Sequence, residues 1–277
     1  MQTHTAPRVG CWQSALGLVL LAWLSGLPGA QATLVIDSFD ASSQYVVAPR
    51  RRAPPRGRFD HTRVSPGEAV GGYRGLQVIR TQGRPGTVEA EVDGAVPGSL
   101  VYSSGAAIKG EAIVSWDGRN RKAAINPTGL RGVNGGVDIT EGGVDYGLLV
   151  RCVADHPAEL EFTIYTDATH YSQASLSVPV DGGLKYGAAQ FIPFSSFTAH
   201  GGGASLANVG AIAMLIDGRR QANLQVAVDY VLATVPELST WLMGAGAVAI
   251  LLCFTWPVHS QGSGVVRIGE SRPGIGE

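Results

Sequence analysis

Cysteine and charge are scarce in this sequence, and no charge sign dominates. The chain of 277 residues has three cysteines, 16% charged residues and a formal net charge of -1. Without a basic field, the chain is not expected to bind nucleic acid. Cys11 lies in the N-terminal signal-peptide region and Cys253 in the apolar segment near the carboxyl end. The central region therefore has Cys152 alone and no intramolecular disulfide. Cys152 lies within the mostly apolar segment 148–153, which predicts a buried, unreactive thiol.

Glycine is abundant, and the central region contains alternating apolar and polar residues that predict β-strands. The 38 glycines accompany many β-branched residues and no long helix-forming blocks. In 160–164, Leu160, Phe162 and Ile164 would share one face of a strand, and 176–180 and 224–229 alternate in the same way. Shorter continuous apolar runs predict strands covered on both sides: 34–36, 112–114 and 211–216.

Turn dipeptides separate these segments at regular intervals. Asp93-Gly94, Asp117-Gly118, Asp181-Gly182-Gly183 and Asp217-Gly218 are typical of hairpins and tight turns. No stretch of the central region shows a helical period over four turns. The pattern predicts about nine or ten strands in an all-β, two-sheet, jelly-roll-like sandwich over residues 33–234.

The first 32 residues have the three parts of a secretory signal peptide. Arg8 supplies positive charge, 15–24 is a short apolar core, and Ala30 and Ala32 are the small residues of a cleavage site. The apolar core is short for a bilayer span, so a retained anchor helix is the lesser alternative. The sequence therefore predicts an exported protein whose mature form begins at Thr33.

A second apolar segment lies near the carboxyl end. Residues 238–258 contain no charged side chain, and Trp241 and Trp256 flank the most apolar part. This length suits one transmembrane helix, with the tryptophans at the membrane interfaces. A buried core helix is the alternative, but nothing else in the sequence predicts helical packing.

The residues just before this segment are Val235, Pro236 and Glu237. Together with the apolar helix they resemble the PEP-CTERM sorting signal, although Leu238 stands where a second proline would complete the motif. The resemblance implies recognition by an exosortase-like sorting enzyme, a sorting motif and transmembrane helix over 235–258, and a tail over 259–277. It places the protein in the cell envelope membrane, at the cell surface, or outside the cell after processing.

The central region also resembles the β-rich ectodomains that accompany such sorting signals. That resemblance implies a jelly-roll ectodomain, similar in shape to carbohydrate-binding modules, without identifying a function. The segments that carry it are 36–40, 115–118, 126–130, 136–140, 191–197 and 209–212.

Three carboxylates are candidates for a structural Ca²⁺ site. Asp37 and Asp40 lie at the first predicted strand and Asp229 at the last, and terminal strands of a jelly roll are often neighbours. Ca²⁺ prefers six to eight oxygen ligands, which two or three carboxylates and backbone carbonyls could supply. The alternative is that these side chains point into water, in which case no cofactor is expected.

Two groups of residues are candidates for contacts with polysaccharide. An arginine run interleaved with prolines predicts a solvated loop, or else a contact for anionic polysaccharide or lipid headgroups. Aromatic side chains could stack on sugars, although Trp116 is better placed in the core. The arginines are Arg50, Arg51, Arg52, Arg56 and Arg58, and the aromatics are Trp116, Tyr73, Tyr102, Tyr146, Tyr165 and Tyr171.

The sequence shows no catalytic motif. It has no Gly-x-Ser-x-Gly elbow and no phosphate-binding loop. The histidines of the central region show no metal-ligand spacing and lie in turn-like sequence: His61, His156, His170 and His200. The leading interpretation is a non-catalytic envelope or matrix protein associated with exopolysaccharide. A carbohydrate-binding module with a defined glycan site is the alternative, and a hydrolase or lyase on the same scaffold is a third.

Overall fold

The computed structural model describes residues 33–48, 56–83, 85–131, 135–144 and 146–234. The predicted signal peptide, with Ala30 and Ala32, lies outside the described residues. So do Arg50 to Arg52, the motif Val235, Pro236 and Glu237, and the predicted transmembrane helix. Within the described ranges, no helix is long and apolar enough to cross a membrane.

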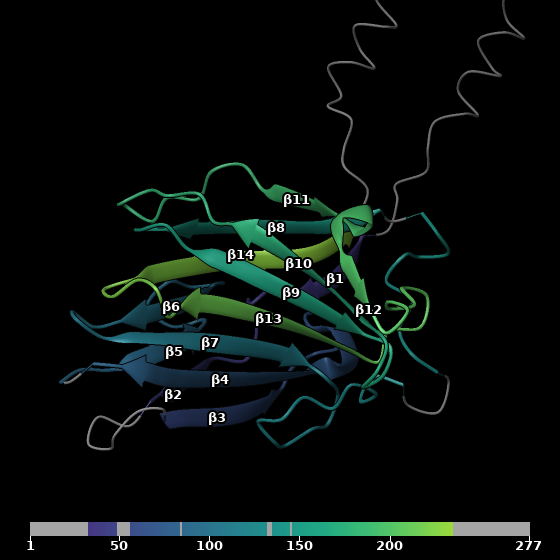
Figure 1. The fold of residues 1–277 in the computed structure, drawn as a ribbon, viewed down its shortest axis with the longest axis horizontal. Helices are drawn as coiled ribbons and strands as arrows, with labels where there is room; N and C mark the ends of the chain where they lie inside the picture. The colour runs from purple at the N-terminus through teal and green to yellow at the C-terminus, as the bar shows by residue number, and fades with distance from the viewer. Residues whose placement is uncertain (1–32, 49–55, 84, 132–134, 145, 235–277) are drawn as a thin grey trace, which may run out of the picture. The chain divides into compact units, whose positions relative to one another are not determined.

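The described residues form fourteen strands in two seven-stranded antiparallel sheets (Figure 1). Sheet A has the order β11-β8-β14-β6-β5-β2, with β1 also paired to β14, and sheet B has the order β12-β10-β9-β13-β7-β4-β3. Sheet A comprises β1 (Leu34–Asp37), β2 (Gln44–Val47), β5 (Val88–Val92), β6 (Leu100–Ser104), β8 (Gly147–Ala154), β11 (Gln190–Pro193) and β14 (Gln225–Thr234). Sheet B comprises β3 (Arg56–Arg63), β4 (Tyr73–Gln82), β7 (Lys109–Trp116), β9 (Glu159–Tyr165), β10 (Tyr171–Ser177), β12 (Thr198–His200) and β13 (Ala211–Gly218).

The core lies between the two sheets and follows the period of two that the sequence predicts. Leu160, Phe162 and Ile164 of β9 are all fully buried, and Val226 and Val228 of β14 face them across the sandwich interior as part of one hydrophobic cluster. Burying one such large apolar side chain contributes about 1.5–3 kcal/mol, so the inward faces provide most of the driving force for folding. The all-β, two-sheet sandwich is therefore confirmed.

Several local predictions need correction. The arginine run was expected to be a loop, but Arg56 and Arg58 belong to β3, which pairs along its whole length with β4. Strand β3 is the edge of sheet B, and edge strands carry charged residues because these discourage pairing with other chains. Asp217 and Gly218 end strand β13 rather than forming the turn.

Candidate functional site

The outer face of sheet A carries an exposed tyrosine whose polar group is held by its neighbours. Tyr45 of β2 is 58% exposed, whereas the residues on either side of it in the strand point inward or are less exposed. Its hydroxyl donates a hydrogen bond of 2.8 Å to Glu89 Oε2, and the hydroxyl of Ser103 donates to Glu89 Oε1 at 3.1 Å. The carboxylate therefore has a fixed orientation at the surface beside an accessible aromatic ring.

A second held group lies farther along the same face. The Arg151 guanidinium on β8 forms an ion pair with Asp229 of β14, with an Nη1–Oδ2 distance of 3.1 Å. The guanidinium also lies over the ring of Tyr186, 5.4 Å from its centroid. Tyr186 reaches this face from the segment between β10 and β11, and its hydroxyl donates a 2.8 Å hydrogen bond to Ser99. Partial burial raises the pKa of Tyr186, so it stays a neutral donor.

Strand pairing places these groups along one face of sheet A. Tyr45 lies opposite Glu91, Glu91 opposite Val101, and Val101 opposite Ala227 of β14. Ala227 in turn pairs with Val153 of β8, so the row crosses five strands and spans about 19 Å at the usual spacing of neighbouring strands. Ala227 and Val153 are each only 1% exposed, so the accessible groups lie on either side of them. We call these residues the sheet A surface: Tyr45, Glu89, Glu91, Val101, Arg151, Tyr186 and Asp229.

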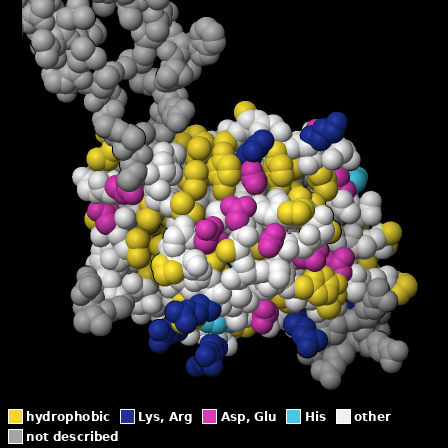
Figure 2. All heavy atoms as spheres, turned by 180° about the vertical axis from the view of Figure 1, so that it is seen from behind, with side chains coloured by type: hydrophobic (Ala, Val, Ile, Leu, Met, Phe, Trp, Pro, Cys, Tyr) yellow, Lys and Arg dark blue, Asp and Glu magenta, His cyan; other side chains and the backbone are white. Residues whose placement is uncertain are grey.

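The chemistry of the sheet A surface suits a polyhydroxylated ligand. Figure 2 shows this side of the molecule, with Asp and Glu side chains gathered near the middle of the face among hydrophobic and uncharged atoms. Carboxylates accept hydrogen bonds from hydroxyl groups, a guanidinium donates to hydroxyl oxygens, and tyrosine rings pack against apolar C–H surfaces. Because the polar side chains are already oriented, binding a ligand would cost little side-chain conformational entropy.

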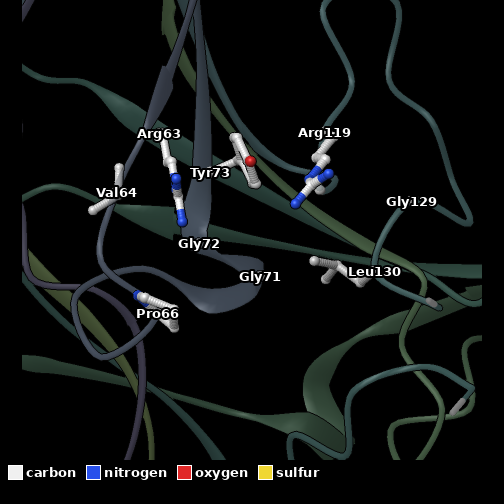
Figure 3. A pocket seen from close by; sticks show the side chains of 10 residues that line it. Arg63, Val64, Pro66, Gly71, Gly72, Tyr73, Arg119, Gly129 and Leu130 are labelled. Carbon is white, nitrogen blue, oxygen red and sulfur yellow. The ribbon is translucent and has the colours of Figure 1, made fainter. Parts of the chain in front are cut away.

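A pocket opens at the end of sheet B where β4 begins (Figure 3). Its volume is about 460 Å³, and Figure 3 shows the side chain of Tyr73 between those of Arg63 and Arg119. The guanidinium of Arg119 lies over the Tyr73 ring at 5.7 Å, and His61 stacks on that ring with centroids 5.2 Å apart. The lining residues are Arg63, Val64, Pro66, Gly71, Gly72, Tyr73, Gly118, Arg119, Gly129 and Leu130.

Two glycine turns shape the pocket. Gly71 has φ of 72°, and a β-carbon there would collide with the side chain of Leu130. Gly118 has φ of 66° and packs against the carbonyl of Gly129, so the loop after β7 folds back on its own start. The predicted turn at Asp117-Gly118 is confirmed. Its carboxylate is buried, which raises the pKa of Asp117, and it accepts hydrogen bonds from Asn120 and Asn126.

The structure does not assemble the three carboxylates of the predicted calcium site. Asp37 faces the core, where its oxygens accept hydrogen bonds from Arg74, Trp116 Nε1 and the backbone N–H of Phe39. Asp40 is exposed in the turn after β1, and Asp229 lies on the outer face with Arg151. Strands β1 and β14 are neighbours as predicted, but alternate residues of a strand point to opposite faces. Among the described residues, no group of three His, Cys, Asp or Glu side chains could hold a metal ion.

Two of the four histidines of the central region lie outside the predicted turns. His61 lies on β3 and His200 on β12, rather than in turns. His156 and His170 do lie in turns, and each contacts a neighbouring aspartate: Asp155 at 3.1 Å and Asp167 at 3.0 Å. None of these contacts brings a histidine to the sheet A surface.

The predicted sugar-stacking aromatics divide into four groups, the first of which is Tyr73 in the pocket. Trp116 and Tyr102 are fully buried, which confirms the core placement of the tryptophan. Tyr165 and Tyr171 pack with His200 on the outer face of sheet B, and Tyr146 is exposed at 62%. The sequence reasoning missed Tyr45 and Tyr186. The alternation in 44–47 carries a signal for the first, but Tyr186 lies in an irregular segment with no pattern.

Cys152 is buried at 1% exposure, as the sequence predicts, and burial raises the pKa of its thiol to about 12. The reactive thiolate is therefore negligible at pH 8. We expect iodoacetamide at pH 8 to leave Cys152 unmodified in the native protein and to modify it fully in denaturant. Peptide mapping by mass spectrometry distinguishes it from Cys11 and Cys253. Modification at equal rates in both conditions would contradict the buried position.

No family model matches this sequence, and no curated protein is similar to it. Solved structures share a similar arrangement at low identity. A family 11 carbohydrate-binding module from Clostridium thermocellum, in complex with a β-1,3-1,4-mixed-linked tetrasaccharide, is 10% identical over 69% of this chain and 95% of its own, with a TM-score of 0.32. An agarase crystal structure is 10% identical over 73% of this chain and 26% of its own, with a TM-score of 0.37. At this distance, the function of the chain has to come from its own residues.

Proposed function

We propose that this chain is a non-catalytic, exported glycan-binding protein, and that the glycan lies across the sheet A surface. The observation that carries the proposal is the combination of an exposed ring at Tyr45 with hydrogen-bonding groups that are already held. Glu89 is fixed by two hydroxyl donors, and Arg151 by an ion pair and a tyrosine ring. A flat apolar face next to oriented polar groups matches a sugar ring, which has C–H faces and hydroxyl edges.

Export is part of the proposal and comes from the two ends of the sequence. The signal-peptide pattern of residues 1–32 and the resemblance of 235–258 to the PEP-CTERM signal support sorting by an exosortase-like enzyme to the cell envelope. There the sandwich would face extracellular polysaccharide. A matrix protein associated with exopolysaccharide and a module with a defined glycan site then differ only in how selective the sheet A surface is.

The proposal is tested with the full chain and a panel of soluble neutral polysaccharides, including a mixed-linkage β-glucan, cellulose oligosaccharides and agarose oligosaccharides. We expect at least one of them to bind with a dissociation constant in the micromolar range, corresponding to about -8 kcal/mol. Calorimetry gives the affinity, and chromatography of the same samples checks that the glycan stays intact. Absence of binding across the panel would refute the sheet A surface as a neutral-glycan site, and release of shorter products would refute the non-catalytic assignment.

A further inference from the structure

We infer that the pocket beside Tyr73 binds an acidic sugar residue, one that carries a carboxylate or a sulfate group. The inference rests on the proposed function because it takes the ligand to be a glycan. The pocket is a separate site, and no residue of the sheet A surface lines it. The pocket lies at the end of sheet B, between the start of β4 and the loop that follows β7 (Figure 3).

The first observation is a local excess of positive charge. The residues that line the pocket include two arginines, Arg63 from the end of β3 and Arg119 from the loop after β7, and no acidic side chain. The neighbouring carboxylate of Asp117 is buried and accepts hydrogen bonds within its own turn.

The second observation is that the two pocket arginines are not paired. Among the described residues, no carboxylate forms an ion pair with Arg63 or Arg119, whereas Arg74, Arg151 and Arg219 each pair with an aspartate. The acidic side chains closest in sequence to the pocket are occupied: Asp60 accepts hydrogen bonds from Gln44 and Thr62, and Glu68 from Ser38. The guanidinium groups therefore remain available to an anion.

The third observation is that stacking on the Tyr73 ring fixes the position of the Arg119 guanidinium. The Tyr73 ring lies against His61, whose Nε2 is 3.2 Å from the carbonyl oxygen of Gly118, and the Arg119 guanidinium lies over the same ring. This stack holds the planar guanidinium at the edge of the pocket. A held guanidinium can bind a carboxylate or sulfate through two parallel hydrogen bonds.

The rest of the lining selects a sugar over a small inorganic anion. Val64, Pro66 and Leu130 give the pocket an apolar side, and its volume of about 460 Å³ exceeds what a bare anion needs. A sugar ring can place its C–H face on these side chains while its acidic group meets the arginines. The pocket is also open to solvent, so a longer chain could continue out of it.

The test compares trigalacturonic acid with the same trimer after reduction of its carboxyl groups, using calorimetry on the full chain. We expect the acidic trimer to bind at least about 10-fold more tightly, because its carboxylates can form charge-assisted hydrogen bonds with the two arginines and the reduced trimer cannot. The double variant Arg63→Gln/Arg119→Gln should lose that preference, and the affinity should fall as salt rises. The control Arg220→Gln removes an exposed arginine beyond the end of β13, at the opposite end of sheet B, and should change nothing.

Several results would overturn the inference. Equal binding of both trimers, or full acidic binding by the double variant with an unchanged melting temperature, would show that the arginines do not select the ligand. Binding of phosphatidylglycerol vesicles or inorganic phosphate without binding of the acidic trimer would assign the pocket to a lipid headgroup or a free anion. The variant Arg151→Ala separates the two proposals: it should weaken neutral glycans and leave the acidic trimer unaffected.

Discussion

Replacing Arg74 with methionine is expected to lower the free energy of unfolding by about 3–5 kcal/mol, because it leaves a buried carboxylate without its counter-charge. Arg74 and Asp37 are both fully buried, with Nε–Oδ2 and Nη2–Oδ1 distances of 2.7 and 3.0 Å. Trp116 Nε1 donates to the same carboxylate at 2.8 Å. The interaction joins β1, β4 and β7, so it connects the two sheets through the core. Denaturant unfolding followed by tryptophan fluorescence measures the loss.

Two controls separate the buried charge from the loss of packing. The double variant Asp37→Leu/Arg74→Met should be more stable than Arg74→Met alone, since no isolated charge remains inside. Arg151→Met removes an arginine from an ion pair whose arginine side chain is 40% exposed, and should cost at most about 1 kcal/mol. Equal losses for Arg74→Met and Arg151→Met would show that the Asp37 network is not a buried ion pair.

Replacing Arg151 with alanine is expected to weaken binding of neutral glycan by about 10- to 100-fold. The substitution removes a charged hydrogen-bond donor, worth roughly 1.5–3 kcal/mol, and frees Tyr186 from the guanidinium above it. Calorimetric titration with the tightest neutral glycan of the panel gives the ratio of affinities to the unmodified protein.

Arg219→Ala provides the matched control for this variant. Arg219 forms an ion pair with Asp217 at 2.9 Å and is about as exposed as Arg151, but it extends from the end of β13 in sheet B. We expect the Arg219→Ala variant to bind neutral glycan with the same affinity as the unmodified protein. A similar drop for both variants would point to a general effect of charge, and no drop for Arg151→Ala would remove this arginine from the glycan site.

The sequence predicted those features that depend on neighbouring residues. Leu160, Phe162 and Ile164 face the core because alternation alone places them there, and Cys152 is buried within the same kind of pattern. The turn at Asp117-Gly118 follows from the glycine's positive φ. Strand β3 was missed because its charged sequence reflects an edge position, which depends on sheet order and not on local composition.

The candidate sites were less predictable because they depend on contacts between distant residues. Asp37 was taken for a calcium ligand, since nothing near it in sequence reveals that Arg74 and Trp116 surround it, 37 and 79 residues away. Tyr186 joins the sheet A surface through Ser99, 87 residues away, from a segment without periodicity. In the same way, the pocket needs the pairing of β3 with β4 to bring His61 beside Tyr73.

The most direct test of the central claim is a crystal structure of the protein with the neutral oligosaccharide that binds most tightly. We predict that the sugar chain crosses β2, β5, β6, β14 and β8 on the outer face of sheet A, with one ring on Tyr45 and hydroxyl groups bonded to Glu89 and Arg151. An oligosaccharide bound elsewhere on the sandwich, with the sheet A surface empty, would contradict the account.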